Sequence, residues 1–155
     1  PSTRSALMRF LQAFRKSGGR VCYDSNYRPR LWMDPDTART LNEAMWTLSD
    51  IALPSVDDEQ EITGETPDVI ARRFLDRGRT GALKRGALGP LCLQTGATYD
   101  FPKAESVVDT TSAGDSFNGG YLGASLMGAS QANALRAGQD LAMQVVGHKG
   151  AILPK

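Results

Sequence analysis

The sequence predicts an α/β protein in which a mostly parallel sheet is flanked by helices. Helical and strand patterns alternate from the start of the chain to about residue 84, and the strand candidates are short apolar runs. Such alternation is typical of a parallel sheet, because a helix is needed to return the chain to the same end of the sheet. The 155 residues fit one ordinary domain. We therefore expect ligand sites beyond the carboxyl ends of the strands.

The first predicted element is a helix. Apolar side chains recur at helical spacing over residues 7–14, after a cap at Ser2 or Thr3, and Ser17-Gly18-Gly19 ends the helix. A short apolar run over Val21–Asp24 follows directly. It predicts the first strand.

The second helix is predicted from its start. Asp34-Pro35-Asp36 combines a cap, a proline at the first helical position and an acidic first turn, and the apolar pattern continues through Met45. The same reasoning predicts strands over Ile51–Leu53 and Thr80–Lys84, with a helix from Thr66-Pro67 to Gly78 between them.

The last third of the sequence departs from this alternation. The segments Leu91–Gln94 and Ala97–Phe101, separated by Thr95-Gly96, predict an antiparallel hairpin. Two helices, Ala113–Met127 and Ser130–Val146, complete the chain. The hairpin is thus expected before the first of these two helices.

Composition excludes several classes of function. The net charge is +1 and the basic and acidic residues are interspersed, so nothing indicates a nucleic-acid partner. No apolar run approaches the ~20 residues of a membrane span, and the amino terminus lacks the apolar core of a signal peptide. We expect a cytoplasmic protein with no membrane partner. Cys22 and Cys92 lie in short apolar segments and are expected to be buried, reduced thiols.

Residues 107–120, VVDTTSAGDSFNGG, carry the most informative pattern. An extended segment turns through small residues into a helix. Small residues let the backbone approach an anion closely, and the amides at the helix start, those of Ala113, Gly114 and Asp115, point at it with the helix dipole behind them. The pattern predicts a phosphate site.

Asp115 lies in the first turn of that helix. A carboxylate beside a bound phosphate is repelled, so a functional explanation is that Asp115 is a general base, accepting the proton of an alcohol that attacks the phosphate. The alternative is that Asp115 only stabilises the helix start, as first-turn acids often do. The local pattern alone favours neither.

The segment Asp109–Phe117, DTTSAGDSF, resembles the second signature of the ribokinase-like (PfkB) carbohydrate kinases. The resemblance implies that Asp115 is the catalytic base, that the Ala113 and Gly114 amides form the anion hole, and that Asp109 helps to bind a monovalent cation such as K⁺. Ser112 stands in the catalytic turn where the family usually has Gly and sometimes Ala.

A second segment, Lys84-Arg85-Gly86-Ala87-Leu88-Gly89, joins a strand end, a cation and a glycine-bearing turn. By itself such a segment is more often a solvated turn. It resembles the Lys-x-Gly-x-x-Gly stretch of the same family, which implies that Lys84, Gly86 and Gly89 belong to the nucleotide site.

Carboxylates gather after the second strand, in residues 54–64, PSVDDEQEITG. They either hold magnesium through water or form a solvated acidic helix start. The family usually carries Asn-x-x-Glu here, and this sequence departs from it with Ser55 and Asp58 at the two ends. That variant is similar to the subfamily that phosphorylates 2-keto-3-deoxygluconate. The resemblance implies that Ser55 lies at the nucleotide and that Asp58 organises water around Mg²⁺.

The segment Asp24–Trp32, DSNYRPRLW, indicates the substrate. It forms an exposed loop after the first strand and combines two guanidinium groups with aromatic rings. Arg binds carboxylates in bidentate fashion and Tyr offers a hydroxyl on a flat ring, although a surface ion-pair cluster has the same composition. Its part Asn26–Trp32, NYRPRLW, resembles the loop of 2-keto-3-deoxygluconate kinases, which implies that Arg28 meets the substrate carboxylate and that Tyr27 and Asn26 also bind the substrate.

After the last helix, residues 146–151 read VGHKGA. Gly147 and Gly150 permit close approach of the backbone to a ligand, and the resemblance places Gly147 beside the nucleotide. His148 is the single histidine of the sequence, and we expect it to be a hydrogen-bonding rather than a metal-binding residue.

Together these features predict that residues 1–155 are the carboxy-terminal, nucleotide-binding portion of a ribokinase-like kinase, without the amino-terminal half and lid. The chain begins at Pro1 without Met, directly before a helical pattern, which fits this expectation. The expected reaction transfers phosphate from ATP, with Mg²⁺, to 2-keto-3-deoxygluconate. The alternatives are a kinase for fructose, ribose or another small sugar, and a non-catalytic nucleotide-binding fragment. We expect the full-length protein to be a homo-oligomer.

Overall fold

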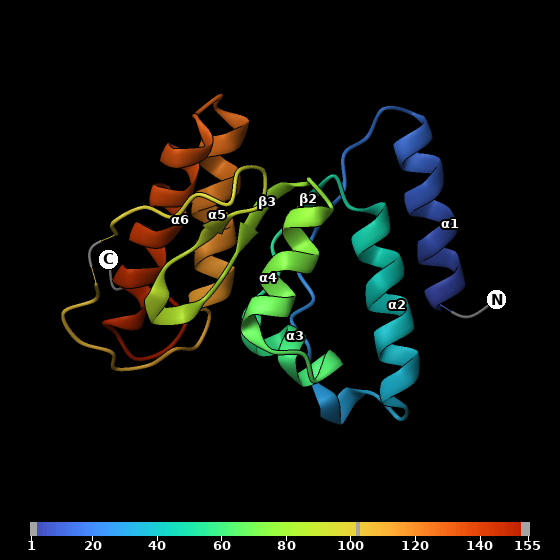
Figure 1. The fold of residues 1–155 in the computed structure, drawn as a ribbon, viewed down its shortest axis with the longest axis horizontal. Coiled ribbons are helices and arrows are strands. Elements are labelled where there is room, and N and C mark those ends of the chain that lie inside the picture. The colour runs from blue at the N-terminus through green and yellow to red at the C-terminus, as the bar shows by residue number, and fades with distance from the viewer. Residues whose placement is uncertain (1–2, 102, 153–155) are drawn as a thin grey trace. The chain divides into compact units, whose positions relative to one another are not determined.

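The structure is a computed structural model that describes residues 3–101 and 103–152 (Figure 1). It contains a sheet with the strand order β1-β2-β3-β4, of which β1–β3 are parallel and β4 is antiparallel. The strands are β1 (Cys22–Tyr23), β2 (Ile51–Ala52), β3 (Thr80–Leu83) and β4 (Leu91–Cys92). The chain divides into two compact units, residues 1–81 and residues 82–155.

The first unit follows the alternation expected from the sequence. Its helices are α1 (Thr3–Lys16), α2 (Pro35–Leu48), α3 (Val56–Thr63) and α4 (Pro67–Asp76), and Pro29–Leu31 form the short 3₁₀ helix η1. The parallel register pairs Cys22 with Ile51 and Ala52 with Gly81. The helix α3 was not among the predicted elements, because it is only eight residues long and its surface is mostly acidic.

The starts of these helices are set by local hydrogen bonds. The carboxylate of Asp34 accepts from the backbone N–H of Asp36 at 3.1 Å and of Thr37 at 3.0 Å, as the predicted cap requires. The Ser55 hydroxyl caps α3 in the same way, accepting from the amide of Asp58. The cap of α4 at Thr66 lacks a side-chain hydrogen bond. Ser2, one of the expected caps of α1, lies outside the described residues.

The core of the first unit is built around Trp46 of α2. Its ring meets the ring of Tyr23 at a centroid distance of 4.5 Å and that of Phe74 at 5.1 Å, both edge to face. Trp46 and Phe74 are each 1% exposed, and Ile70 and Leu53 of the same unit are fully buried. Burial of these aromatic and aliphatic groups holds α2 and α4 to the sheet.

The helix α1 has no buried residue, although its apolar side chains recur at helical spacing. Leu7, Phe10 and Phe14 are 48%, 63% and 42% exposed. The end of α1 is held by an ion pair of 2.8 Å between Arg15 and Asp50, whose carboxylate also accepts from the Val21 amide. The apolar face of α1 is therefore open within this chain.

Cys22 is exposed, and the expectation that it is buried was wrong. The reason is topological: among the described residues, β1 stands at the edge of the four-stranded order and pairs with β2 on one side only. Cys92, on β4, is buried as expected.

The second unit contains the end of β3, β4, the short 3₁₀ helix η2 (Gly86–Leu88), α5 (Ala113–Leu126) and α6 (Gln131–Val146). The expected hairpin partner of β4 does not form, because β4 pairs with β3, matching Ala82 with Cys92, and residues 97–101 are irregular. The amide of Cys92 still donates to Ala97 O at 3.0 Å, which closes a tight turn there.

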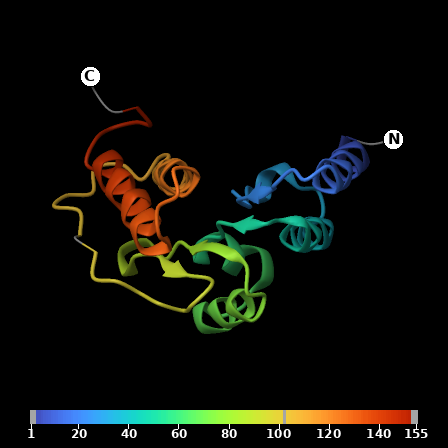
Figure 2. The ribbon, with the colours of Figure 1, turned by 90° about the horizontal axis from the view of Figure 1, so that it is seen from above.

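The helices α5 and α6 lie side by side in Figure 1 and Figure 2 and pack through glycines. A Cβ at Gly120 would lie 2.5 Å from Ala137 O, and a Cβ at Gly138 would lie 2.8 Å from Phe117 O. These contacts leave no room for a methyl group, so the two backbones touch directly. Among the described residues, none of the helices is both long and apolar enough to cross a membrane.

Gly81 is required by the sheet. Its φ is +146°, and a Cβ would lie 1.8 Å from Ala52 O, a backbone atom of the neighbouring strand. This contact explains why a buried parallel strand carries a glycine instead of a branched residue.

We predict that Gly81→Ala lowers the free energy of unfolding by about 3 kcal/mol or more, because a backbone atom cannot yield as a side chain does. Urea unfolding followed by circular dichroism measures this loss. The control is Gly123→Ala in α5, where a Cβ meets nothing within 4 Å; there Ala should stabilise the helix by about 0.5–1 kcal/mol. Equal midpoints for Gly81→Ala and the unsubstituted chain would contradict this account.

Candidate functional site

The amino-terminal end of α5 has the geometry of an anion site. The amide of Ala113 donates to Thr110 O at 3.2 Å and that of Ser116 to Ser112 O at 2.9 Å, whereas acceptors in the described part of the chain do not engage the amides of Gly114 and Asp115. Unpaired N–H groups at a helix start attract negative charge, as does the helix dipole. Of the three amides expected to bind phosphate, those of Gly114 and Asp115 are thus available to it, whereas that of Ala113 is occupied by Thr110 O.

Ser112 makes this helix start possible. Its φ and ψ are +61° and +14°, a left-handed conformation, and its side chain makes no capping hydrogen bond. The left-handed turn breaks the regular backbone directly before α5. For a residue other than glycine, this left-handed conformation costs roughly 1–2 kcal/mol.

Asp115 is exposed and lies in the first turn of α5. Its carboxylate is close in sequence to the two available amides, and solvent, or a ligand in its place, can reach it. The position suits a group that accepts a proton from a bound molecule.

Lys84 brings positive charge to the same helix start. Its Nζ donates to Oδ1 of Asn118 at 3.3 Å and lies 3.5 Å from the position that a Cβ of Gly114 would occupy. The bare backbone of Gly114 therefore faces the ammonium group. Asn118 was not among the predicted site residues, although its place one turn after Asp115 on the same helix is a signal for it.

The glycine turn after Lys84 has a defined conformation, stabilised by a hydrogen bond from Arg85. Gly86 and Gly89 have φ of +54° and +71°, and a Cβ at Gly89 would lie 3.1 Å from the Phe101 ring. Arg85 closes the turn, donating from Nε to Gly89 O at 3.0 Å. Burial lowers the pKa of Arg85.

Asp109 ties the segment before α5 to the turn after α6. One carboxylate oxygen accepts from the amide of Thr111 and the other from the amide of Gly150, each at 2.9 Å. Hydrogen bonds from the Thr111 side chain, the Thr111 amide and the Gly150 amide lower the pKa of Asp109. Asp109 is therefore an anion at neutral pH, with oxygen lone pairs left for a cation.

Gly147 and His148 lie in the turn that follows α6. Gly147 adopts a right-handed conformation, and its Cβ position meets only ordinary contacts. Nδ1 of His148 lies 2.9 Å from Gln144 O, so this histidine is a hydrogen-bonding residue, as expected.

In the first unit, the loops after β1 and β2 meet at Asp58. Its Oδ2 accepts from the Ser25 hydroxyl at 3.3 Å, and its amide donates to the Ser55 hydroxyl at 3.1 Å. The expected pair Ser55 and Asp58 is thus brought together, and Ser25 joins it. Ser25 was missed as an individual residue, although it lies within the loop that the sequence singled out.

The loop after β1 is only partly exposed. Tyr27 is 7% exposed and packs in a cluster with Ala38, Ile62 and Trp32, so its ring lies in a core rather than on the surface expected. Arg28 is exposed, and its NH1 donates to the Tyr27 carbonyl at 2.7 Å. Asn26 has a positive φ of 38° and its amide donates to Asp24.

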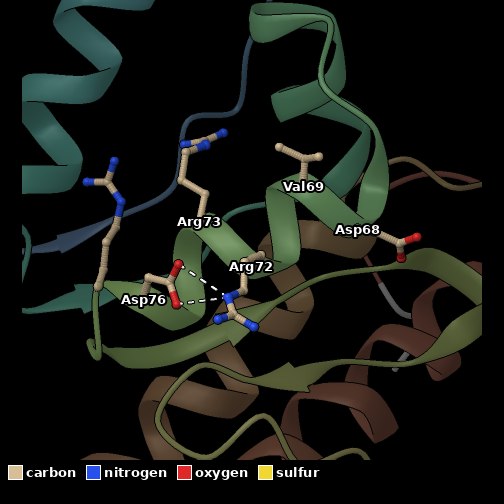
Figure 3. Close-up of a pocket in the computed structure, with 6 residues that line it drawn as sticks. Asp68, Val69, Arg72, Arg73 and Asp76 are labelled. Carbon is tan, nitrogen blue, oxygen red and sulfur yellow. Dashed lines mark hydrogen bonds and ion pairs between the residues drawn. The ribbon is translucent and has the colours of Figure 1, made fainter.

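A surface hollow on α4 is not assigned a function (Figure 3). Its lining residues are Asp68, Val69, Arg72, Arg73, Asp76 and Arg77. Arg72 and Asp76 form an ion pair at 3.1 Å. All of these residues belong to one helix or follow it directly, and a single helix leaves a ligand exposed to water. Within residues 3–101 and 103–152, no cluster of at least three His, Cys, Asp or Glu side chains has the arrangement of a metal site.

Known proteins resemble the chain in sequence. The pattern of the pfkB family carbohydrate kinases matches residues 1–155. The chain is 39% identical to the 2-dehydro-3-deoxygluconokinase of Escherichia coli strain W, covering 100% of this chain and 52% of that enzyme. Identity to the 2-dehydro-3-deoxygluconokinase of Dickeya dadantii strain 3937 is also 39%, over 99% of this chain and 52% of the relative. The chain spans about half the length of these curated relatives.

Solved structures resemble it in fold. Aminoimidazole riboside kinase from Salmonella enterica, complexed with aminoimidazole riboside and an ATP analogue, matches with a TM-score of 0.83 and 28% identity, over 97% of this chain and 54% of that one. Fructokinase from Vibrio cholerae, with fructose, ADP and calcium bound, matches with a TM-score of 0.81 and 25% identity, over 96% and 51%. These similarities confirm the predicted ribokinase-like α/β fold.

The strained turn before α5 gives a prediction. Ser112→Gly should stabilise the chain by about 1 kcal/mol, because glycine adopts the left-handed conformation without steric cost. Thermal unfolding measures the change. The control is Ser116→Gly, the same substitution inside the helix, which should destabilise the chain by about 0.5 kcal/mol. A decrease in stability for both variants would contradict the assigned strain.

Proposed function

The chain belongs to the pfkB family of carbohydrate kinases, and we propose that it carries the ATP site and the catalytic base of an enzyme that phosphorylates a sugar acid. The observation that carries the proposal is the start of α5. There the amides of Gly114 and Asp115 are available, the Asp115 carboxylate lies in the same turn, and Nζ of Lys84 lies beside Gly114. The substrate we propose is 2-keto-3-deoxygluconate, after which the 2-dehydro-3-deoxygluconokinases are named. Its product is the 6-phosphate.

The phosphate side of the reaction falls to the second unit. The amides of Gly114 and Asp115, with Ala113 in the same turn, take up charge that develops on the phosphoryl oxygens, and Lys84 adds a positive charge. The glycines at 86, 89 and 147 leave backbone accessible to the nucleotide. The Gly114 backbone lies beside Nζ of Lys84, so a phosphate bound there would meet both a backbone amide and a positive charge.

The proton side of the reaction falls to Asp115. A sugar hydroxyl that attacks the γ-phosphoryl group loses its proton as the new O–P bond forms, and the Asp115 carboxylate accepts it. ATP supplies the phosphoryl group. The leaving group is ADP, so the protein needs no covalent intermediate and contributes position and electrostatics.

Two cation sites are part of the proposal. Asp58, with Ser55 beside it, orders water around Mg²⁺, which is usually held by few carboxylates together with phosphates. Asp109 contributes to a site for K⁺ or another monovalent cation, and its ionised carboxylate between two turns suits that role.

The sugar acid is assigned to the loop after β1. Arg28 is exposed at the carboxyl end of β1, where ligands of parallel sheets bind. Tyr27 supports the loop from the core, and Asn26 forms its turn. The runner-up, a kinase for a neutral sugar, draws support from the fructokinase similarity. Two arginines in the loop favour an acid, because a neutral sugar offers them no carboxylate.

We assign residues 1–155 to the carboxy-terminal half of a longer kinase. The relatives are about twice as long, and the apolar face of α1 is open. In the part of the chain that the structure describes, strand β1 likewise has a neighbour on one side only. An amino-terminal half that covers α1 and completes the sugar pocket accounts for both features. A homo-oligomer of the full-length protein is part of the same proposal.

Asp115→Asn in the full-length protein should lower kcat by about 10²–10⁴-fold, the usual contribution of a general base, with little change in the KM for ATP. Coupled measurement of ADP release with 2-keto-3-deoxygluconate and Mg²⁺ tests this. The control is Asp68→Asn, which removes a first-turn carboxylate from α4.

Equal kcat values for the two Asn variants would remove Asp115 from the mechanism. Binding of ATP without turnover of any sugar by the unsubstituted protein would leave only the nucleotide-binding alternative.

The loop after β1 gives a second prediction. Arg28→Ala should raise the KM for the sugar acid by about 10–100-fold, the equivalent of a charge-assisted hydrogen bond of about 1.5–3 kcal/mol. The control is Arg30→Ala, an exposed arginine of the same loop. Steady-state kinetics with the acid and with a neutral sugar of the same length distinguish a sugar-acid kinase from a neutral-sugar kinase. An equal effect on both sugars would contradict a contact between Arg28 and the carboxylate.

A further inference from the structure

A carboxylate that the proposed reaction does not use is buried in the first unit. Glu59 of α3 is 0% exposed. Its Oε1 accepts from Nδ2 of Asn42 at 3.1 Å and from Nε1 of Trp46 at 3.2 Å, and its Oε2 accepts from the Arg73 guanidinium at 2.8 Å. A buried charge is stable only with such partners.

The network extends beyond Glu59 on both sides. The hydroxyl of Tyr23 on β1 donates to Oδ1 of Asn42 at 2.7 Å, and Nε of Arg73 donates to Glu65 at 2.9 Å. Burial, then the charges of Glu59, Asp24 and Asp58, raise the pKa of Tyr23, which keeps it a neutral donor.

Arg73 stays charged within the same network. Burial alone would lower its pKa, but the hydrogen bond and charge of Glu59, with those of Glu65, raise it. One continuous set of hydrogen bonds thus links β1, α2, α3 and α4, and Glu59 is its centre.

This network fixes the rotation of α3 about its axis. The helix has only eight residues, and its other buried side chains, Val56 and Ile62, lie on the same face as Glu59. Successive residues of a helix point about 100° apart. With Glu59 directed into the core, Asp58 is directed to its side, where its carboxylate accepts from Ser25 and its amide donates to Ser55.

We propose that Glu59 is a positioning residue, which holds the Asp58 carboxylate in the direction needed to order water around the magnesium of the kinase reaction. The proposal rests on the proposed function for the role of Asp58. Glu59 itself touches neither substrate nor metal. Its effect passes through the backbone of the first turn of α3.

The first test needs no catalysis. In Glu59→Gln, an NH₂ group replaces one carboxylate oxygen and the negative charge is lost. The network then lacks its charge pairing with Arg73, while the side-chain shape is kept. Hydrogen exchange at the Asp58 amide, which donates to Ser55, should become about fivefold faster, the effect of one weakened hydrogen bond. The control is Glu65→Gln, which removes the other carboxylate bound to Arg73 but lies beyond α3. It should leave the Asp58 amide unchanged.

The second test is the magnesium dependence of turnover in the full-length protein. In Glu59→Gln the half-saturating Mg²⁺ concentration should rise about tenfold or more, as it does when a group supporting a metal site is lost. The KM for the sugar acid should stay the same, and Glu65→Gln should match the unsubstituted enzyme. If Glu59→Gln fails to fold, Tyr23→Phe removes one donor at the edge of the network and should produce smaller shifts in both readouts.

The outcomes separate this proposal from the proposed function. Unchanged exchange at the Asp58 amide overturns the positioning role, whether or not the protein is active. Faster exchange with an unchanged magnesium dependence in an active enzyme also overturns it. A full-length protein without turnover overturns the proposed function, and exchange at Asp58 then still decides whether Glu59 orients that residue.

Discussion

The pairing of one buried charge constrains the whole first unit. Glu59 is fully buried, and its carboxylate requires the donors of Asn42, Trp46 and Arg73. Those donors come from α2 and α4, so α3 can dock only where both helices offer them. Because removing one partner of a buried ion pair leaves an uncompensated charge, the arrangement is specific as well as stable. The docked α3 in turn contacts the loops after β1 and β2, because Asp58 bonds Ser25 and Ser55.

The second unit depends on small residues rather than on charge. Gly120 and Gly138 bring the backbones of α5 and α6 into contact, and the left-handed Ser112 starts α5 where Gly114 faces Lys84. Small residues at the start of α5 expose backbone amides to an anion, but they provide little side-chain packing. Asp109 offsets part of that loss, because its carboxylate fastens the turn after α6 to the segment before α5.

Local signals predicted much of this structure. Asp34 and Pro35 set the start of α2, and the motif around Asp115 predicted the start of α5, because caps and helix starts depend on neighbouring residues. The sequence alone did not predict the exposure of Cys22, the pairing of β4 with β3 or the burial of Tyr27, since each depends on which distant segment becomes a neighbour. The contacts of Ser25 and Asn118 were missed for the same reason. The role of Glu59 was hidden because it stands in a run of acidic residues, of which Asp57 and Glu61 are exposed.

The central claim is that the start of α5 receives the phosphates of ATP. Amide chemical shifts of the full-length protein, followed by NMR during titration with a non-hydrolysable ATP analogue and Mg²⁺, test it most directly. The account predicts that the Gly114 and Asp115 amides shift most strongly and saturate together with nucleotide binding. Saturable binding that leaves both amides unchanged would contradict it.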